Sequence, residues 1–345
     1  MKNIDYGKLG ITLSLAFMLI LMTPQTAFSQ ENQTSLSNST SLRTEYAPLP
    51  ENARGPTIPE KGYIVEELGE NLYFLSNGAY NTMFMVTDEG VIAIDAPSAI
   101  GENYLKAISE VTNKTVTHFI YSHTHKDHVG AASIFPDNAT YIAHEDTANQ
   151  LKIANDPGRP IPNVTFAESY DVRIGNETVL RLDYPGVTHE PGNIFIYAPT
   201  QQTLMFVDVV YPGWVPFDGL AGAENVTGFI QAANVMMNNY DFNNFVAGHL
   251  TRLGTVDDIR THQEFLQDLQ TTAQQVRQNV SSADIASVVG PSNLGNPWAI
   301  TNTYLETLTE QCTNLMSEKW QNRLGGVDIF MDDNCAAMLR SLNVD

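Results

Sequence analysis

The sequence is poor in basic residues, in cysteine and in long apolar runs. Its 345 residues carry 39 acidic side chains against 18 basic ones, which gives a formal net charge of −21. Such a charge repels a phosphate backbone, so we expect no nucleic-acid substrate. No Gly-x-Ser-x-Gly stretch marks the nucleophile turn of a serine hydrolase. The chemistry of this chain therefore has to come from other residues.

The first apolar run, over residues 9–22, is short for a membrane span. Lys2 and Lys8 precede it and small residues follow at Ala27 and Ser29, so residues 1–29 are predicted to be a signal peptide. An uncleaved N-terminal anchor is the alternative. Both alternatives predict a secreted, extracytoplasmic or cell-surface protein. If the signal peptide is cleaved, we expect no stable membrane span in the mature chain. Asn-x-Ser/Thr acceptors, compatible with a glycoprotein, occur at Asn32, Asn38, Asn113, Asn138, Asn163, Asn176, Asn225 and Asn279.

Composition divides the rest of the chain into three parts. Residues 30–60 are rich in Ser, Thr, Asn and Pro without apolar periodicity, which predicts a disordered linker. From Tyr63 to Asp95, short apolar runs separated by Gly, Asn and Asp predict a meander of strands. The 43% hydrophobic content is ordinary for a globular core. We expect a main domain over 61–275 and a C-terminal helical extension over 276–345.

Residues 123–128 concentrate metal-ligand side chains in the order His-Thr-His-Lys-Asp-His. The β-branched and aromatic run 116–121 predicts a buried strand before them, and 129–135 predicts a helix after them. In extended backbone the first two histidines point the same way and can reach one ion, while the aspartate and third histidine splay toward a second. Zinc takes such ligands. A solvated surface cluster is the alternative, but four ligand-type residues in six favour a metal.

The pattern H-x-H-x-D-H resembles the signature of the metallo-β-lactamase superfamily, which implies an α/β fold, the αββα sandwich. Three later residues match that family's order of ligands: one histidine in a Gly-rich loop, one aspartate ending an apolar strand and one histidine after Gly248. Thr188 and Glu190 flank the loop histidine, where the family usually has Gly and Thr. The resemblance implies one zinc on His123, His125 and His189, a second on Asp127, His128 and His249, and Asp208 between them.

Several residues keep two interpretations. Asp95, after the strand at 91–94, either steadies a ligand histidine or is a turn residue. The remaining histidines, His118, His144 and His262, are expected to be packing or surface residues. Cys312 and Cys335 predict a disulfide between two C-terminal helices, over 302–323 and 332–342, with buried free thiols as the alternative.

The resemblance also implies a reaction. Two zinc ions would supply a bridging hydroxide that attacks a carbonyl, with Asp127 orienting it. Tyr211 lies where lactone-cleaving members carry a tyrosine that stabilises an oxyanion, although packing against Trp214 and Phe217 is the alternative. Trp214, Pro216 and Phe217 also suggest an apolar lip for a small-molecule substrate.

We expect the protein to hydrolyse an ester, with a lactone as the preferred substrate class. The resemblance leaves open β-lactam or thioester hydrolysis and a sulfur dioxygenase with one Fe²⁺ in place of two Zn²⁺. No cysteine lies near Asp208, as the familiar β-lactamases with a cysteine on the second zinc would require. A metal-stabilised binding protein without turnover is the non-enzymatic alternative.

Overall fold

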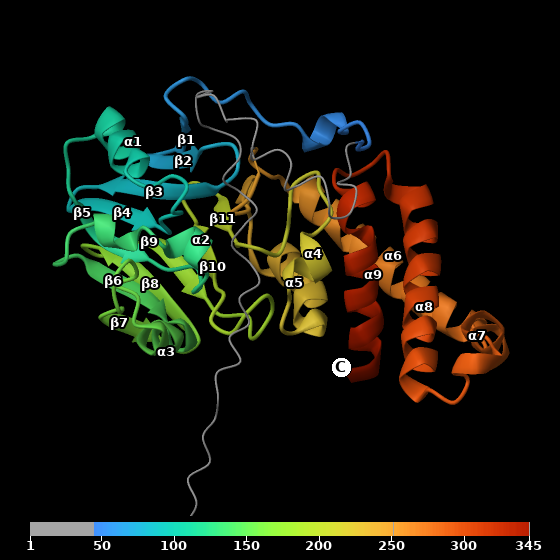
Figure 1. Cartoon of the computed structure of the whole chain (residues 1–345). Helices are drawn as coiled ribbons and strands as arrows, with labels where there is room; N and C mark the ends of the chain where they lie inside the picture. Colours follow the sequence, from blue (N-terminus) through green and yellow to red (C-terminus); the bar gives the residue numbers. More distant parts are fainter. Residues whose placement is uncertain (1–44, 251, 345) are drawn as a thin grey trace, which may run out of the picture. The chain divides into compact units, whose positions relative to one another are not determined.

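The computed structural model describes residues 45–250 and 252–344, and the chain from Ala47 onward forms one compact unit. Two β-sheets pack face to face in this unit (Figure 1). The first has the order β1-β2-β3-β4-β5-β6-β7 and the second the order β12-β11-β10-β9-β8. Their bounds are β1 (Ile64–Gly69), β2 (Leu72–Ser76), β3 (Asn81–Thr87), β4 (Gly90–Ile94), β5 (Val116–Ile120), β6 (Thr140–His144), β7 (Val164–Phe166), β8 (Ser169–Ile174), β9 (Glu177–Asp183), β10 (Phe195–Ala198), β11 (Thr203–Met205) and β12 (Asn244–Val246).

Apolar side chains fill three layers. One layer lies between the sheets, where Met83 and Ile92 of the first sheet meet Leu182 and Val246 of the second. Helices cover the outer face of each sheet, which gives the predicted αββα sandwich. The helices are α1 (Asn103–Val111), α2 (Lys126–Val129) and α3 (Glu145–Ala154) beside the first sheet, then α4 (Asp218–Ala221), α5 (Val226–Asn239), α6 (Val256–Asn279), α7 (Ser282–Val289), α8 (Pro297–Trp320) and α9 (Val327–Val344), with short 3-10 turns at Glu51–Ala53, Ala132–Ile134 and Pro291–Asn293.

Strand direction brings chain segments together at one edge of the sandwich. Strands β4 to β7 run parallel, so their carboxyl ends share an edge of the first sheet. In the second sheet β11 and β12 are parallel to each other. Asp95 and residues 123–128 follow β4 and β5, while Asp208 and His249 follow β11 and β12. Residues far apart in sequence therefore have a structural reason to meet.

The C-terminal helices are part of the core on the second sheet. Cys312 of α8 and Cys335 of α9 form a disulfide, as expected, with their Cα atoms 6.0 Å apart. Trp320 of α8 packs edge-to-face on Phe265 of α6, with ring centroids 5.3 Å apart. The division of the chain at 275/276 stays a prediction; α6 runs across it, and both sides share one apolar cluster.

Two local expectations differ from the structure. Residues 45–60, expected to lack a fold, contain the turn Glu51–Ala53, and Ala53 is buried with its carbonyl accepting a hydrogen bond from Trp214 Nε1 at 3.0 Å. The bond to Trp214 is made by a backbone carbonyl, so the apolar periodicity of the sequence gives no sign of it.

The helix expected over 129–135 is instead α2 with a separate 3-10 turn. It begins inside the histidine motif, where Asp127 in the first turn suits the positive end of a helix.

The predicted signal peptide and residues 30–44 of the predicted linker lie outside the described residues. Among residues 45–250 and 252–344, helices that combine the length and apolarity of a membrane span are absent.

Candidate metal centre

The seven predicted ligands converge at the shared edge of the two sheets. Nitrogen and oxygen donors fall into two groups, and within each group one donor atom per residue lies within 4.8 Å of the others. The first group joins two residues from the loop after β5 to the loop before β10 and the end of β11. The second joins the start of α2 to the end of β12. The groups are His123, His125, His189 with Asp208, and Asp127, His128 with His249.

Asp208 lies between the two groups. Its Oδ2 is 3.4 Å from the Nε2 atoms of both His123 and His189 and 3.2 Å from His128 Nε2, while its Oδ1 is 3.1 Å from His249 Nε2. Asp208 has a left-handed backbone (φ 62°), which is strained for a residue with a side chain. The carboxylate thus faces both groups at once, as expected of a bridging ligand.

A glycine is required before the last histidine. Gly248 has a φ of +85°, and a Cβ there would come within 2.6 Å of Val207 and 3.1 Å of the His128 ring. The neighbouring Asn81 holds the strand end by donating from its backbone N–H to Gly248 O at 2.7 Å and from its side chain to His249 O at 2.9 Å. The Gly-His pair is therefore positioned by sterics and by backbone bonds.

The donor atoms fit divalent cations. His125 Nδ1 and His189 Nε2 lie 2.9 Å apart, as do His128 Nε2 and His249 Nε2, and such nitrogen pairs repel each other unless a proton or a cation lies between them. His123 Nε2 and Asp208 Oδ1 are buried and, although the Asp208 carboxylate and His249 Nε2 lie near them, neither atom makes a well-aligned hydrogen bond in the described chain. Buried polar atoms of this kind need a partner, and a metal ion supplies it.

A hydrogen-bond relay orients His123. Ser122 donates from its backbone N–H to Asp95 Oδ1 at 2.8 Å and from its hydroxyl to Asp95 Oδ2 at 2.7 Å. The same hydroxyl lies 2.8 Å from His123 Nδ1 and, with its hydrogen on Asp95, accepts the Nδ1 hydrogen. This tautomer leaves the Nε2 lone pair facing Asp208. Asp95 thus steadies a predicted ligand, through Ser122, rather than serving only as a turn residue.

Glu190 plays the corresponding part for His125. Glu190 is 4% exposed, and its carboxylate accepts from Thr124 N–H at 2.5 Å and from the Thr124 hydroxyl at 2.9 Å. Its Oε2 lies 3.3 Å from His125 Nε2, which leaves His125 Nδ1 free to face the centre. The sequence showed Glu190 only as a departure from the family pattern; the structure shows that this departure contacts a predicted ligand.

Charge is unevenly distributed over the histidines. Burial lowers the pKa of His123 to about 4 and that of His189 to about 3. Burial opposes the charge of His128 as well, but the Asp208 and Asp127 carboxylates outweigh it and raise the pKa of His128 to about 9. Without metal, a proton therefore resides on His128 against Asp208. Metal binding has to displace it.

Two tyrosines flank His249. The Tyr80 ring lies 4.8 Å from the His249 ring, and its hydroxyl is 3.4 Å from Asp127 Oδ2. The Tyr211 ring stacks on His249 at 6.0 Å, and burial together with the Asp208 carboxylate raises its pKa. Sequence analysis named Tyr211 but missed Tyr80, which directly precedes β3, some forty residues before the motif, and carries no local signal of a site.

Of the three residues expected to form an apolar lip, Trp214 is half-buried and Pro216 is buried, whereas Phe217 is exposed. The indole of Trp214 bonds to Ala53 O and its backbone pairs with Gly325, while Pro216 is buried. Phe217 is 54% exposed and packs on Phe330, with ring centroids 5.0 Å apart. Residues 214–217 pack toward the C-terminal helices because apolar side chains of those helices are available for contact there.

The other histidines take the packing roles expected of them. His144 is buried, accepts a hydrogen bond from Asp146 N–H at 3.1 Å at the start of α3, and lies 2.8 Å from Ala167 O. His262 is buried in α6 beside Phe229. His118 is half-buried in β5, 3.0 Å from the Thr117 hydroxyl.

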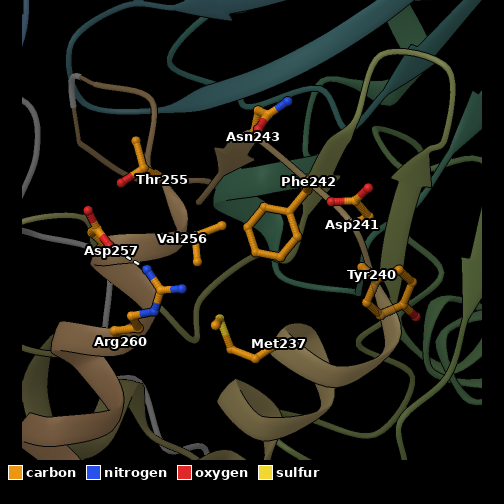
Figure 2. Close-up of a pocket in the computed structure, with 9 residues that line it drawn as sticks. All are labelled: Met237, Tyr240, Asp241, Phe242, Asn243, Thr255, Val256, Asp257 and Arg260. Atoms are coloured by element: carbon orange, nitrogen blue, oxygen red, sulfur yellow. Dashed lines mark hydrogen bonds and ion pairs between the residues drawn. The ribbon is translucent and has the colours of Figure 1, made fainter.

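A cavity of about 510 Å³ lies elsewhere, where the end of α5, the residues before β12 and the start of α6 meet. Figure 2 shows Phe242, Met237 and Val256 in its wall and the Arg260–Asp257 ion pair, 2.6 Å long, at its edge. His249 follows the opposite end of β12, and the lining includes none of the predicted ligands. The cavity is therefore separate from the metal centre.

Comparison with known proteins agrees with the geometry. The family model described as the metallo-beta-lactamase superfamily matches residues 76–249, about half of the chain. The 2,4-dinitroanisole O-demethylase subunit alpha of Nocardioides sp. (strain JS1661) is 30% identical over 199 residues, covering 56% of this chain and 60% of that subunit. The chain thus spans less than two thirds of that relative.

Two metallo-β-lactamases are also similar. The type 2 enzyme of Elizabethkingia meningoseptica is 25% identical over 209 residues, covering 57% of this chain and 82% of the enzyme. The solved structure of the enzyme from Pontibacter korlensis has a TM-score of 0.50 and 21% identity, covering 59% of this chain and 99% of that one, which shows the shared fold. With half of its sequence matching the family model and five of its histidines gathered at the sheet edge, the chain belongs to the metallo-β-lactamase superfamily.

Proposed function

We propose that the protein is an exported hydrolase that holds two zinc ions and cleaves a carbonyl ester, first of all a lactone. One observation carries the proposal: two groups of donors face each other across the Asp208 carboxylate. All of the donors are imidazole nitrogens or carboxylate oxygens, which suits zinc. When bound, zinc lowers the pKa of a coordinated water to about 7 and polarises a carbonyl.

The two carboxylates of the site have different exposure, and this divides their roles. The Asp208 side chain is 5% exposed, whereas that of Asp127 is 45% exposed. Asp208 is therefore placed to hold cations, and Asp127 is placed to touch both a cation and an incoming water. The Tyr80 hydroxyl, 3.4 Å from Asp127 Oδ2, restricts the orientation of that carboxylate. We assign oxyanion stabilisation to Tyr211, which lies next to His249.

A substrate panel with metal analysis tests the proposal. Chromogenic lactone, ester, β-lactam, thioester and phosphodiester substrates are incubated with purified protein, with and without chelator. Turnover of the lactone or ester that chelator abolishes, with two zinc ions per chain, supports the proposal. One iron per chain with oxygen-dependent turnover of a persulfide would establish the dioxygenase alternative instead.

The likeness to the demethylase subunit favours a second candidate, hydrolysis of an activated aryl methyl ether to a phenol and methanol. Both reactions displace an oxygen leaving group from an electron-poor carbon by water. Appearance of yellow 2,4-dinitrophenolate from 2,4-dinitroanisole tests it. We prefer ester hydrolysis because the two donor groups, with Asp127 as their more exposed carboxylate, suffice for it.

Export is supported by the disulfide, since such bonds persist mainly in oxidising compartments. Glycan acceptors at Asn113, Asn138, Asn176 and Asn279 are exposed. Asn225 instead accepts a hydrogen bond from Gly228 N–H at the start of α5. N-terminal sequencing of protein from the native host tests cleavage, and a mature chain starting at Met1 would contradict it.

A further inference from the structure

Element α4 has a left-handed backbone and forms a turn between Asp208 and the residues that bond to the His189 loop. Gly219, Leu220, Ala221 and Gly222 have φ values of 62°, 60°, 56° and 65°. Left-handed backbone is unfavourable for residues with a side chain, so Leu220 and Ala221 need support from outside the turn. The segment carrying this turn begins at Asp208 and leads into α5.

Asn334 of α9 supplies that support. Its side chain is fully buried, and both ends of its amide bond to the turn segment. Leu220 donates its backbone N–H to Asn334 Oδ1 at 2.6 Å, and Asn334 Nδ2 donates to Pro216 O at 2.9 Å. Asparagine provides a donor and an acceptor without charge, which a buried site requires. Removing the amide would leave two buried backbone groups unpaired.

The residues after the turn hold the loop of a predicted ligand. Glu224 donates its backbone N–H to His189 O at 2.9 Å, and Asn225 donates to Thr188 O at 3.1 Å. Gly228 lies so close to Val187 O that a side chain there would collide with it. A displacement of the turn is therefore transmitted to the backbone of His189.

The helix that carries Asn334 is fixed in turn. The next residue, Cys335, is bonded to Cys312 of α8. One turn earlier on α9, Phe330 packs on Phe217 at the start of the left-handed turn. The turn thus rests on a rigid helical pair.

We propose that Asn334 is a positioning residue for the metal centre. Through the left-handed turn, it fixes the His189 loop and with it the three-histidine group. The inference rests on the proposed two-metal site but not on its substrate. It assigns to the C-terminal extension a part in the hydrolase centre.

Cobalt titration followed by visible absorption tests the proposal in the full chain without any substrate. We expect Asn334→Ala to bind one Co²⁺ as wild type does and the second about tenfold to a hundredfold more weakly, the range for residues that orient ligands. Asn343→Ala is the matched control, because Asn343 lies on the same helix, is exposed, and bonds within that helix to Leu339 O. Met338→Ala controls for loss of stability, since Met338 is buried in the same core.

A second variant separates positioning from folding. Ala221→Gly relieves the left-handed strain, so the double variant with Asn334→Ala should recover most of the lost cobalt affinity. Amide hydrogen exchange of residues 217–226 in metal-free protein gives a readout that needs neither metal nor activity, and Asn334→Ala should accelerate it. The proposal is overturned if Asn334→Ala binds both cobalt ions like wild type, or if Met338→Ala weakens the second ion by the same factor. If the wild-type protein binds both cobalt ions but does not hydrolyse lactones, this result counts against the proposed function and leaves the role of Asn334 standing.

Discussion

Replacing Glu190 with glutamine tests whether the metal centre depends on a residue that departs from its family's pattern. Glutamine keeps the shape and can still accept from Thr124 N–H, but it removes the negative charge 3.3 Å from His125 Nε2. Ligand histidines bind metal more tightly when a carboxylate accepts their other N–H, and losing that carboxylate costs about tenfold to a hundredfold in affinity. We therefore expect zinc affinity to fall by about 1.4–2.8 kcal/mol.

Truncation to alanine is predicted to act differently. Glu190→Ala leaves the buried N–H and hydroxyl of Thr124 without their acceptor, and each charge-assisted bond contributes about 1.5–3 kcal/mol. The metal-free protein should then lose about 3 kcal/mol or more of its free energy of unfolding, whereas Glu190→Gln should lose less than half of that.

Two assays separate these effects. Competition with a chromophoric chelator measures zinc affinity, and urea unfolding of the metal-free protein measures stability. Glu168→Gln is a suitable control, because Glu168 is exposed. The reasoning fails if Glu190→Gln binds zinc as tightly as wild type while both variants unfold at the same urea concentration.

Three further predictions concern Asp127, His262 and the disulfide. Asp127→Asn should lower kcat about a hundredfold or more with an unchanged circular dichroism spectrum, because the exposed carboxylate of the site is lost; near wild-type kcat would remove Asp127 from the mechanism. Burial lowers the pKa of His262 to about 3, so below pH 6.5 the unfolded chain binds a proton that the folded chain does not, and stability falls as the pH falls. Between pH 7 and 5 urea unfolding should show a loss of about 2 kcal/mol that His262→Met lacks, and equal losses in both proteins would refute this. Replacing Cys312 and Cys335 with serine opens a loop whose ends are 23 residues apart and should cost about 3 kcal/mol of unfolding free energy, measured in the same way; an unchanged midpoint would show that the bond adds nothing.

Part of the fold was predictable because central strands such as β4 are buried on both faces. All five residues of β4 are buried, so the strand appears in the sequence as an uninterrupted apolar run between turn residues. The ligands were predictable for a related reason: donors that directly follow strands, such as His123 and Asp208, reach one edge whenever the sheets pack. Recognition of the H-x-H-x-D-H pattern then supplied their grouping.

The residues that sequence analysis missed act through contacts between distant parts of the chain. Glu190 bonds to a residue 66 positions away, Tyr80 to one 47 positions away, and Asn334 to one 114 positions away. A glutamate in a turn or an asparagine within a helix has no local pattern that reveals such a partner. For the same reason the left-handed conformation of Leu220 and Ala221 could not be predicted, because it depends on Asn334.

The predicted ligands are divided between the two halves of the sandwich. Residues 123–128 follow a strand of the first sheet, whereas Asp208 and His249 follow strands of the second. Ions held by both sets would act as removable cross-links, and each would stabilise the folded chain in proportion to the logarithm of its free concentration. Scarcity of the metal would then lower the stability of the folded chain as well as any activity that depends on the ions.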